Sequence, residues 1–188
     1  MTRQQLEHLL RASASILINS GSRSPTQELV VIGSQAILGQ YPQAPGVLLR
    51  SMEADLYPLR EPELADAIDG AIGELSAFHD TYGYYAQGVG PETATLPAKW
   101  IERVIPVKSE ATGQAVGLCL EAHDLAISKY VAGRDKDLSF TFELARHGIT
   151  TRSVLLERLK NTALPDVIRK LVRQRIALHF ISKLSFCD

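Results

Sequence analysis

The sequence lacks any apolar run of the roughly 20 residues that a membrane-spanning helix requires. Its first residues, Met1 to His8, also lack the apolar core of a signal peptide. We therefore expect a cytoplasmic protein that makes no contact with a membrane.

Cysteine is scarce, and neither sign of charge predominates. Cys119 and Cys187 lie far apart and form no Cys-x-x-Cys or Cys/His cluster, which argues against both a disulfide framework and a zinc site. We expect Cys119 to be a core residue. The 20 basic residues nearly balance the 21 acidic ones, so no overall field attracts the chain to nucleic acid or to an anionic surface.

Hydrophobic residues make up 45% of the 188 positions, which is enough for a buried core. The first part of the chain is rich in β-branched residues and glycine, and the part after residue 120 reads as charged amphipathic helices. We predict an α/β portion over residues 1–120 and a helical portion over residues 121–188. The predicted strands are 28–32, 53–58, 100–107 and 115–120, and the predicted helices are 6–17, 64–78, 123–132, 136–147, 151–159 and 165–184.

A short apolar run ends in Gly33-Ser34 and is followed by a segment that is compatible with a helix. Unpaired backbone N–H groups at the start of a helix favour phosphate, so this turn is a candidate phosphate site. An ordinary strand-to-helix turn with a serine cap is the structural alternative.

Two acidic residues, Glu53 and Asp55, stand two positions apart in the second predicted strand. Alternate residues of a strand leave it on the same face, so both carboxylates would point the same way. A pair of carboxylates can hold a divalent metal ion. Acids on the solvent face of an edge strand are the alternative interpretation.

With these residues, the chain resembles a known superfamily. Gly33-Ser34 followed by Glu53-x-Asp55 is similar to the Gly-Ser…Asp-x-Asp signature of polymerase-β-type nucleotidyltransferases. The stretch from Asp124 to Lys129, and then Arg134-Asp135-Lys136-Asp137, resembles the Asp-Leu-x-x-x-Lys…Arg-x-Lys-Asp segment of bacterial nucleotidyltransferase-like proteins. That group includes toxin components of abortive-infection toxin–antitoxin systems.

The resemblance implies an α+β fold, in which a small mixed sheet flanked by helices precedes a helical C-terminal portion. It also implies transfer of a nucleoside monophosphate from a nucleoside triphosphate to an RNA, such as tRNA, or to a protein. Mg²⁺ or Mn²⁺ would be the cofactor, and an antitoxin would be the partner if the chain is a toxin.

The same resemblance implies roles for individual residues. Gly33 and Ser34 would hold the β- and γ-phosphates, and Glu53 and Asp55 would bind the metal. Glu102 would be the third carboxylate and general base, with Glu121 as the alternative. The remaining residues of the implied nucleotide site are Lys129 or Lys136, either of which would reach the triphosphate, and Asp137, which would orient one of these lysines.

Several alternatives stay open. Most members of the superfamily have aspartate where this chain has Glu53, so a catalytically silent fold that binds a nucleotide or a partner is the second hypothesis. Lys129 and the charged residues after it would then be solvated helix ends. The aromatic segment 82–85 serves either packing or base stacking, and the basic residues of the last helix (Arg169, Lys170, Arg173 and Arg175) form either a solvated face or a docking face for RNA or an acidic partner.

Overall fold

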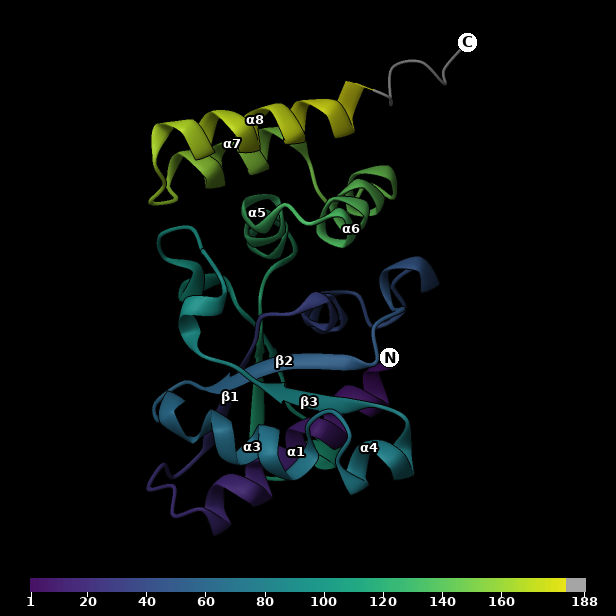
Figure 1. Ribbon diagram of the computed structural model, residues 1–188, viewed down its shortest axis with the longest axis vertical. Helices are drawn as coiled ribbons and strands as arrows, with labels where there is room; N and C mark the ends of the chain where they lie inside the picture. Colours follow the sequence, from purple (N-terminus) through teal and green to yellow (C-terminus); the bar gives the residue numbers. More distant parts are fainter. Residues whose placement is uncertain (182–188) are drawn as a thin grey trace. The chain divides into compact units, whose positions relative to one another are not determined.

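A computed structural model describes residues 1–181 of the chain. These residues form two compact units, and each is described by itself. The first unit comprises residues 1–93 and 104–121, and the second comprises residues 94–103 and the chain from residue 122 onward. Figure 1 shows the strands in the first unit and helices α5 to α8 in the second.

The first unit is built on a five-stranded mixed sheet with the strand order β3-β2-β1-β5-β4. β1 pairs antiparallel with β2 and parallel with β5, while β3 runs parallel to β2 and β4 runs antiparallel to β5. The sheet confirms the predicted α+β class. Its strands are β1 (Gln27–Val31), β2 (Glu53–Pro58), β3 (Tyr85–Gly88), β4 (Ile105–Val107) and β5 (Ala115–Cys119).

Helices cover this sheet with apolar faces. α1 begins at a capping box formed by Thr2 and Gln5, and its leucines at positions 6, 9, 10 and 17 are fully buried. Figure 1 shows α1, α3 and α4 on the same side of the sheet. The helices of this unit are α1 (Arg3–Asn19), α2 (Ile37–Gln40), α3 (Ala65–Ile72) and α4 (Ala77–Tyr82), and its short 3₁₀ turns are 34–36, 46–48, 62–64, 91–93 and 110–112.

The single helix predicted over residues 64–78 is wrong, because the chain turns between α3 and α4. α3 ends at Ile72 with Gly73 as its C-cap, and Leu75 adopts a positive φ of 62° with 83% of its surface exposed. Ser76 then caps α4 by accepting a hydrogen bond from the backbone N–H of His79. The apolar spacing continues across this turn, although the helix does not.

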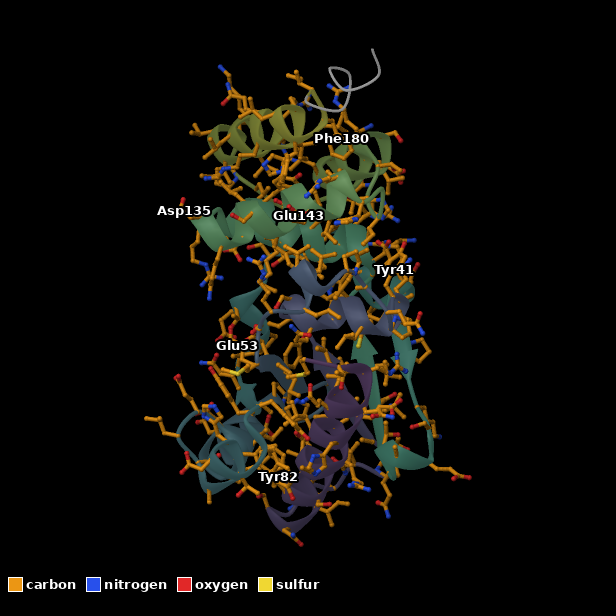
Figure 2. The ribbon with its side chains drawn as sticks, turned by 90° about the vertical axis from the view of Figure 1, so that its right-hand side faces the viewer. Tyr41, Glu53, Tyr82, Asp135, Glu143 and Phe180 are labelled. Carbon is orange, nitrogen blue, oxygen red and sulfur yellow. The ribbon has the colours of Figure 1, made fainter. Side chains whose placement is uncertain are left out.

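The strand β3 was not predicted, because the segment that contains it is rich in aromatic residues and glycine. The tyrosines of this segment serve packing. Tyr84 and Tyr85 are buried, and Tyr82 contacts the rings of Phe78 and His8. In Figure 2, Tyr82 lies well apart from Glu53. Tyr84 therefore belongs to the core, and Tyr82, which is 50% exposed, packs at its edge against Phe78 and His8.

The second unit packs four helices together. α7 and α8 lie side by side in Figure 1, and α5 contacts all three of the others. These helices are α5 (Ala122–Ala132), α6 (Asp135–Arg146), α7 (Arg152–Lys160) and α8 (Asp166–Ile181). The predicted last helix extended to residue 184, and its final residues lie outside the part that the structure describes.

Two of the four basic residues of α8 are used inside this unit. Arg169 donates hydrogen bonds to the carbonyl oxygens of Leu159, Thr162 and Leu164 and so caps the end of α7. Arg175 donates to the carbonyl oxygen of Tyr130 at 2.6 Å. The basic character of α8 is therefore partly structural.

Cys119 is buried, as expected for a core residue, and burial raises the pKa of its thiol to about 12. Cys187 lies outside the described residues. None of the helices within residues 1–181 combines the length and the apolar composition that crossing a membrane requires.

Candidate functional site

The turn at Gly33 lies directly against the carboxylate of Asp55. Ile32 donates a backbone hydrogen bond to the carbonyl oxygen of Asp55, which brings the end of β1 beside the start of β2. A Cβ atom at Gly33 would lie 2.1 Å from Oδ2 and 2.8 Å from Cγ of Asp55. The φ of Gly33 is −76°, which any residue can adopt, so glycine is needed here for space and not for backbone conformation.

Ser34 begins the 3₁₀ turn that follows, with Gly33 as its cap, and Ser34 is partly exposed. The next residue, Gln35, is fully buried and donates its side-chain amide to the carbonyl oxygen of Ser51 at 3.2 Å. This bond ties the Gly-Ser turn to the segment that leads into β2. Sequence reasoning did not identify Gln35 as a contributor to the site.

Glu53 and Asp55 lie in β2 as predicted, on the same face of the strand. Figure 2 labels Glu53 at the margin of the strand-bearing unit in that view. The neighbouring strand β3 places Tyr85 opposite Glu53 and Gln87 opposite Asp55. Cross-strand partners share a face, so four polar side chains occupy this part of the sheet.

The hydroxyl group of Tyr85 donates a hydrogen bond to Oε2 of Glu53 at 3.1 Å. Burial raises the pKa of Tyr85 to about 12, and the negative charge of Glu53 acts in the same direction. The phenol is therefore protonated at neutral pH and can donate this bond. Tyr85 was also absent from the residues that the sequence nominated for the site.

Glu102 lies in a 3₁₀ turn (Trp100–Arg103) and not in a strand, so the first part of the strand predicted over residues 100–107 is wrong. The strand that forms, β4, is limited to Ile105–Val107. The side chain of Arg103 explains the turn, because it pairs with Asp124 and also donates to the carbonyl oxygen of Ala98. Glu102 belongs to the second unit and is 63% exposed, with Lys99 at 4.0 Å. Its role as the third carboxylate stays a prediction.

Glu121, the alternative third carboxylate, follows β5 in the first unit. β1 and β5 are parallel, and Leu120 donates a backbone hydrogen bond to Val31, so Glu121 lies at the end of the sheet where the Gly-Ser turn begins. β2 starts from the same end, because it runs antiparallel to β1. The topology therefore brings Glu121, Gly33 and the acid pair to one end of the sheet.

Lys129 and Asp137 come together in the second unit. Lys129 Nζ lies 3.2 Å from Oδ1 of Asp137, and Arg134 Nε lies 2.6 Å from Oδ2. The chain reverses between α5 and α6 at Gly133, which has a φ of +65°. The side chains of Lys129 and Asp137 are only 14% and 1% exposed, so these two residues are not the solvated helix ends of the structural alternative. Lys136 is exposed in the first turn of α6.

This ion pair makes the stability of the second unit depend on pH. Burial alone would raise the pKa of Asp137, but Arg134 and Lys129 outweigh it and hold the pKa below the usual value. A depressed pKa in the folded state adds stability above the unfolded pKa of about 3.9. That stability is lost as the pH falls through the folded pKa.

We therefore expect Asp137→Asn to be less stable than wild type by an amount that is largest above about pH 5 and shrinks below about pH 4. Urea unfolding at a series of pH values measures this difference. Asp135→Asn is the control, because Asp135 is exposed in the same helical turn. A difference that stays constant from pH 6 to pH 3 would contradict the expectation.

The residues of the first unit suit a divalent cation. Two carboxylates on one face of a strand supply the oxygen donors that Mg²⁺ and Mn²⁺ prefer. Within residues 1–181, no three carboxylate, imidazole or thiol side chains are grouped closely enough to form a metal site without further ligands. Waters and substrate phosphates commonly complete the coordination of Mg²⁺.

A family described as "Nucleotidyltransferase of unknown function (DUF6036)" matches residues 7–163 of the chain. The chain belongs to this nucleotidyltransferase family. The match spans both units and includes every residue that the sequence nominated for the site. It confirms the resemblance to nucleotidyltransferase-like proteins. No curated protein and no solved structure matches the chain significantly.

Proposed function

We propose that this nucleotidyltransferase is metal-dependent and transfers a nucleoside monophosphate from a nucleoside triphosphate to an RNA or protein hydroxyl group. The contact between Gly33 and the Asp55 carboxylate carries the proposal, because it joins the two halves of the sequence signature in one place. Both halves lie in the same compact unit, so the contact does not depend on how the units are arranged.

Each residue has a role in this proposal. Glu53 and Asp55 would hold Mg²⁺ or Mn²⁺, which when bound supplies charge neutralisation for the triphosphate and lowers the pKa of the attacking hydroxyl. Ser34 and the backbone beside it would bind the β- and γ-phosphates. Lys129 or Lys136 is proposed to bind the triphosphate, with Asp137 orienting one of these lysines.

The reaction is an in-line substitution at the α-phosphorus. The acceptor oxygen forms a bond to this phosphorus, and the bond to the oxygen that bridges to the β-phosphorus breaks. Pyrophosphate leaves, and the acceptor proton passes to a base, for which Glu102 and Glu121 are the candidates. Positioning and charge neutralisation supply most of the catalysis in such a reaction.

A test incubates the full chain with each labelled nucleoside triphosphate, total tRNA or a bacterial lysate, and Mg²⁺ or Mn²⁺. We expect the label to enter RNA or protein only when the metal is present, with chelation by EDTA as the control. Calorimetry with Mn²⁺ and each triphosphate measures binding separately. Absence of both binding and transfer for all four nucleotides would contradict the proposal.

A toxin role is part of the same proposal. Growth arrest on expression in bacteria, relieved by loss of the acid pair, would support it and would justify a search for an antitoxin. Normal growth together with measurable transfer would contradict the toxin role alone.

The second candidate is a catalytically silent nucleotidyltransferase fold that binds a nucleotide or a protein partner. The glutamate at position 53 favours it, because most members of the superfamily have aspartate there. Nucleotide binding without transfer to any acceptor would identify this case.

A further inference from the structure

Glu53 loses more conformational freedom than an aspartate would when it binds a metal ion. Its side chain has one more rotatable bond than aspartate, so more conformational freedom must be lost when the carboxylate is fixed on a cation. A carboxylate that another group already holds in place loses less on binding. In this structure, the hydroxyl group of Tyr85 can hold the Glu53 carboxylate in place.

Tyr85 stands directly opposite Glu53 in the parallel pairing of β2 and β3. Its hydroxyl group lies 3.1 Å from Oε2 of Glu53, while the residue as a whole is only 9% exposed. A buried ring on a paired strand has little freedom to move, so the hydroxyl is presented at a fixed position. The contact therefore restrains the end of the Glu53 side chain, where the extra freedom lies.

The ring of Tyr85 also packs against a neighbouring aromatic ring. The imidazole of His79 lies against it, with the ring centroids 4.6 Å apart and an angle of 49° between the planes. His79 is held in turn, because its Nδ1 accepts a hydrogen bond from the backbone N–H of Leu75, and its backbone N–H donates to Oγ of Ser76. A chain of contacts thus runs from the start of α4 to the acid pair.

We propose that Tyr85 is the positioning residue of the acid pair, holding Glu53 in the orientation in which it binds the metal together with Asp55. The inference rests on the proposed metal-dependent function. Tyr85 acts through Glu53 and does not touch the nucleotide. The tyrosine thereby explains how a glutamate can stand where most nucleotidyltransferases have an aspartate.

The chain supplies a matched control at the next position. Tyr84 is also 9% exposed, and its hydroxyl makes one side-chain hydrogen bond, to Nδ1 of His8 at 2.8 Å. Tyr84 comes directly before β3 and contacts His8 of α1, whereas Tyr85 contacts Glu53 of β2. Tyr84→Phe and Tyr85→Phe each remove one hydrogen-bonded hydroxyl group, but only the second removes a bond to the acid pair.

The experiment titrates Mn²⁺ into the full-length chain, with ATP present, and follows free Mn²⁺ by electron paramagnetic resonance. Mutation of an outer partner of a metal ligand typically costs about 10–100-fold in affinity, so we expect Tyr85→Phe to weaken Mn²⁺ binding about tenfold. Tyr84→Phe should stay within about twofold of wild type. In a Glu53→Asp background, Tyr85→Phe should cost less than about threefold, because the shorter side chain needs no such support.

A spectroscopic measurement on the wild-type chain does not depend on the variants. With ¹³Cζ-labelled tyrosine, added Mg²⁺ should shift the resonance of Tyr85 and leave that of Tyr84 unchanged. Equal effects of the two Phe variants on Mn²⁺ affinity, or an unshifted Tyr85 resonance, would overturn the positioning role.

Failure of the inference and failure of the proposed function give different results. If wild type binds Mn²⁺ and Asp55→Asn does not, but Tyr85→Phe behaves as wild type, the function stands and the positioning role is overturned. If wild type itself binds no Mn²⁺ with any nucleoside triphosphate, both are overturned.

Discussion

Gly33→Ala is expected to abolish metal binding and nucleotide transfer about as completely as Asp55→Asn, although it removes no functional group. The new methyl carbon would lie 2.1 Å from Oδ2 of Asp55, so the carboxylate must rotate away. Loss of an outer partner costs about 10–100-fold in metal affinity, so displacement of a ligand itself should cost at least about 100-fold. Titration with Mn²⁺ and labelled-nucleotide transfer measure the effect.

The same substitution should leave the fold in place. The backbone of Gly33 is extended and suits alanine, and the closest clashing atom is the end of a side chain. We expect a loss of only about 1 kcal/mol in the free energy of unfolding, at the low end for overpacking. In an Asp55→Ala background this cost should nearly vanish, because Oδ2 and Cγ are gone.

Gly46→Ala is the matched control for Gly33→Ala. Nothing lies within 4 Å of a Cβ atom at Gly46, so the same chemical change meets open space. Metal affinity and stability should both stay near the wild-type values. Wild-type Mn²⁺ affinity in Gly33→Ala would show that the Asp55 carboxylate is not the ligand.

Local patterns were sufficient to predict the strand that carries the acid pair. The bounds of β2 and the shared face of Glu53 and Asp55 follow from residue alternation alone. The close approach of Gly33 to Asp55 does not, because it depends on the antiparallel register between β1 and β2. The sequence could nominate both parts, but it could not show that they touch.

Tyr85 could not be predicted for a related reason. β3 has only four residues, Tyr-Ala-Gln-Gly, and these show no apolar alternation. Its position beside β2 comes from the strand order of the sheet, which joins residues about 30 positions apart. Two tyrosines after a glycine turn were a weak signal for a strand, and nothing in them indicated Glu53 as a partner.

The error at residues 100–107 has a different cause. The apolar residues there suit a strand, and the spacing to the acid pair suits a third carboxylate at Glu102. The backbone instead forms a 3₁₀ turn that places the side chain of Arg103 on Asp124. Asp124 lies 21 residues further along the chain. A buried ion pair of this kind overrides local propensity, and no window of the sequence reveals it.

Asp124→Asn is expected to destabilise the second unit by about 3–5 kcal/mol, the usual cost of removing one partner from a buried ion pair. Asp124 is fully buried, with Arg103 Nε at 2.8 Å from Oδ2 and Arg158 Nε at 3.1 Å from Oδ1. One carboxylate thus balances two guanidinium groups, from the 94–103 segment and from α7. Asparagine has nearly the same shape but no charge, so both arginines would lose the buried negative charge that they share.

Glu157→Gln provides the control, because it removes one negative charge from the same arginine at the surface. Glu157 Oε1 lies 3.3 Å from Arg158 Nη1 and is 63% exposed, so its loss should cost less than about 1 kcal/mol. Urea unfolding followed by circular dichroism measures both variants.

Asp124 is the first residue of the motif that resembles bacterial nucleotidyltransferase-like proteins. A large effect of Asp124→Asn on stability, with unchanged Mn²⁺ affinity in the folded protein, would mean that this motif residue maintains the helical unit. Equal stability of the two variants would show that the buried charge is compensated in another way.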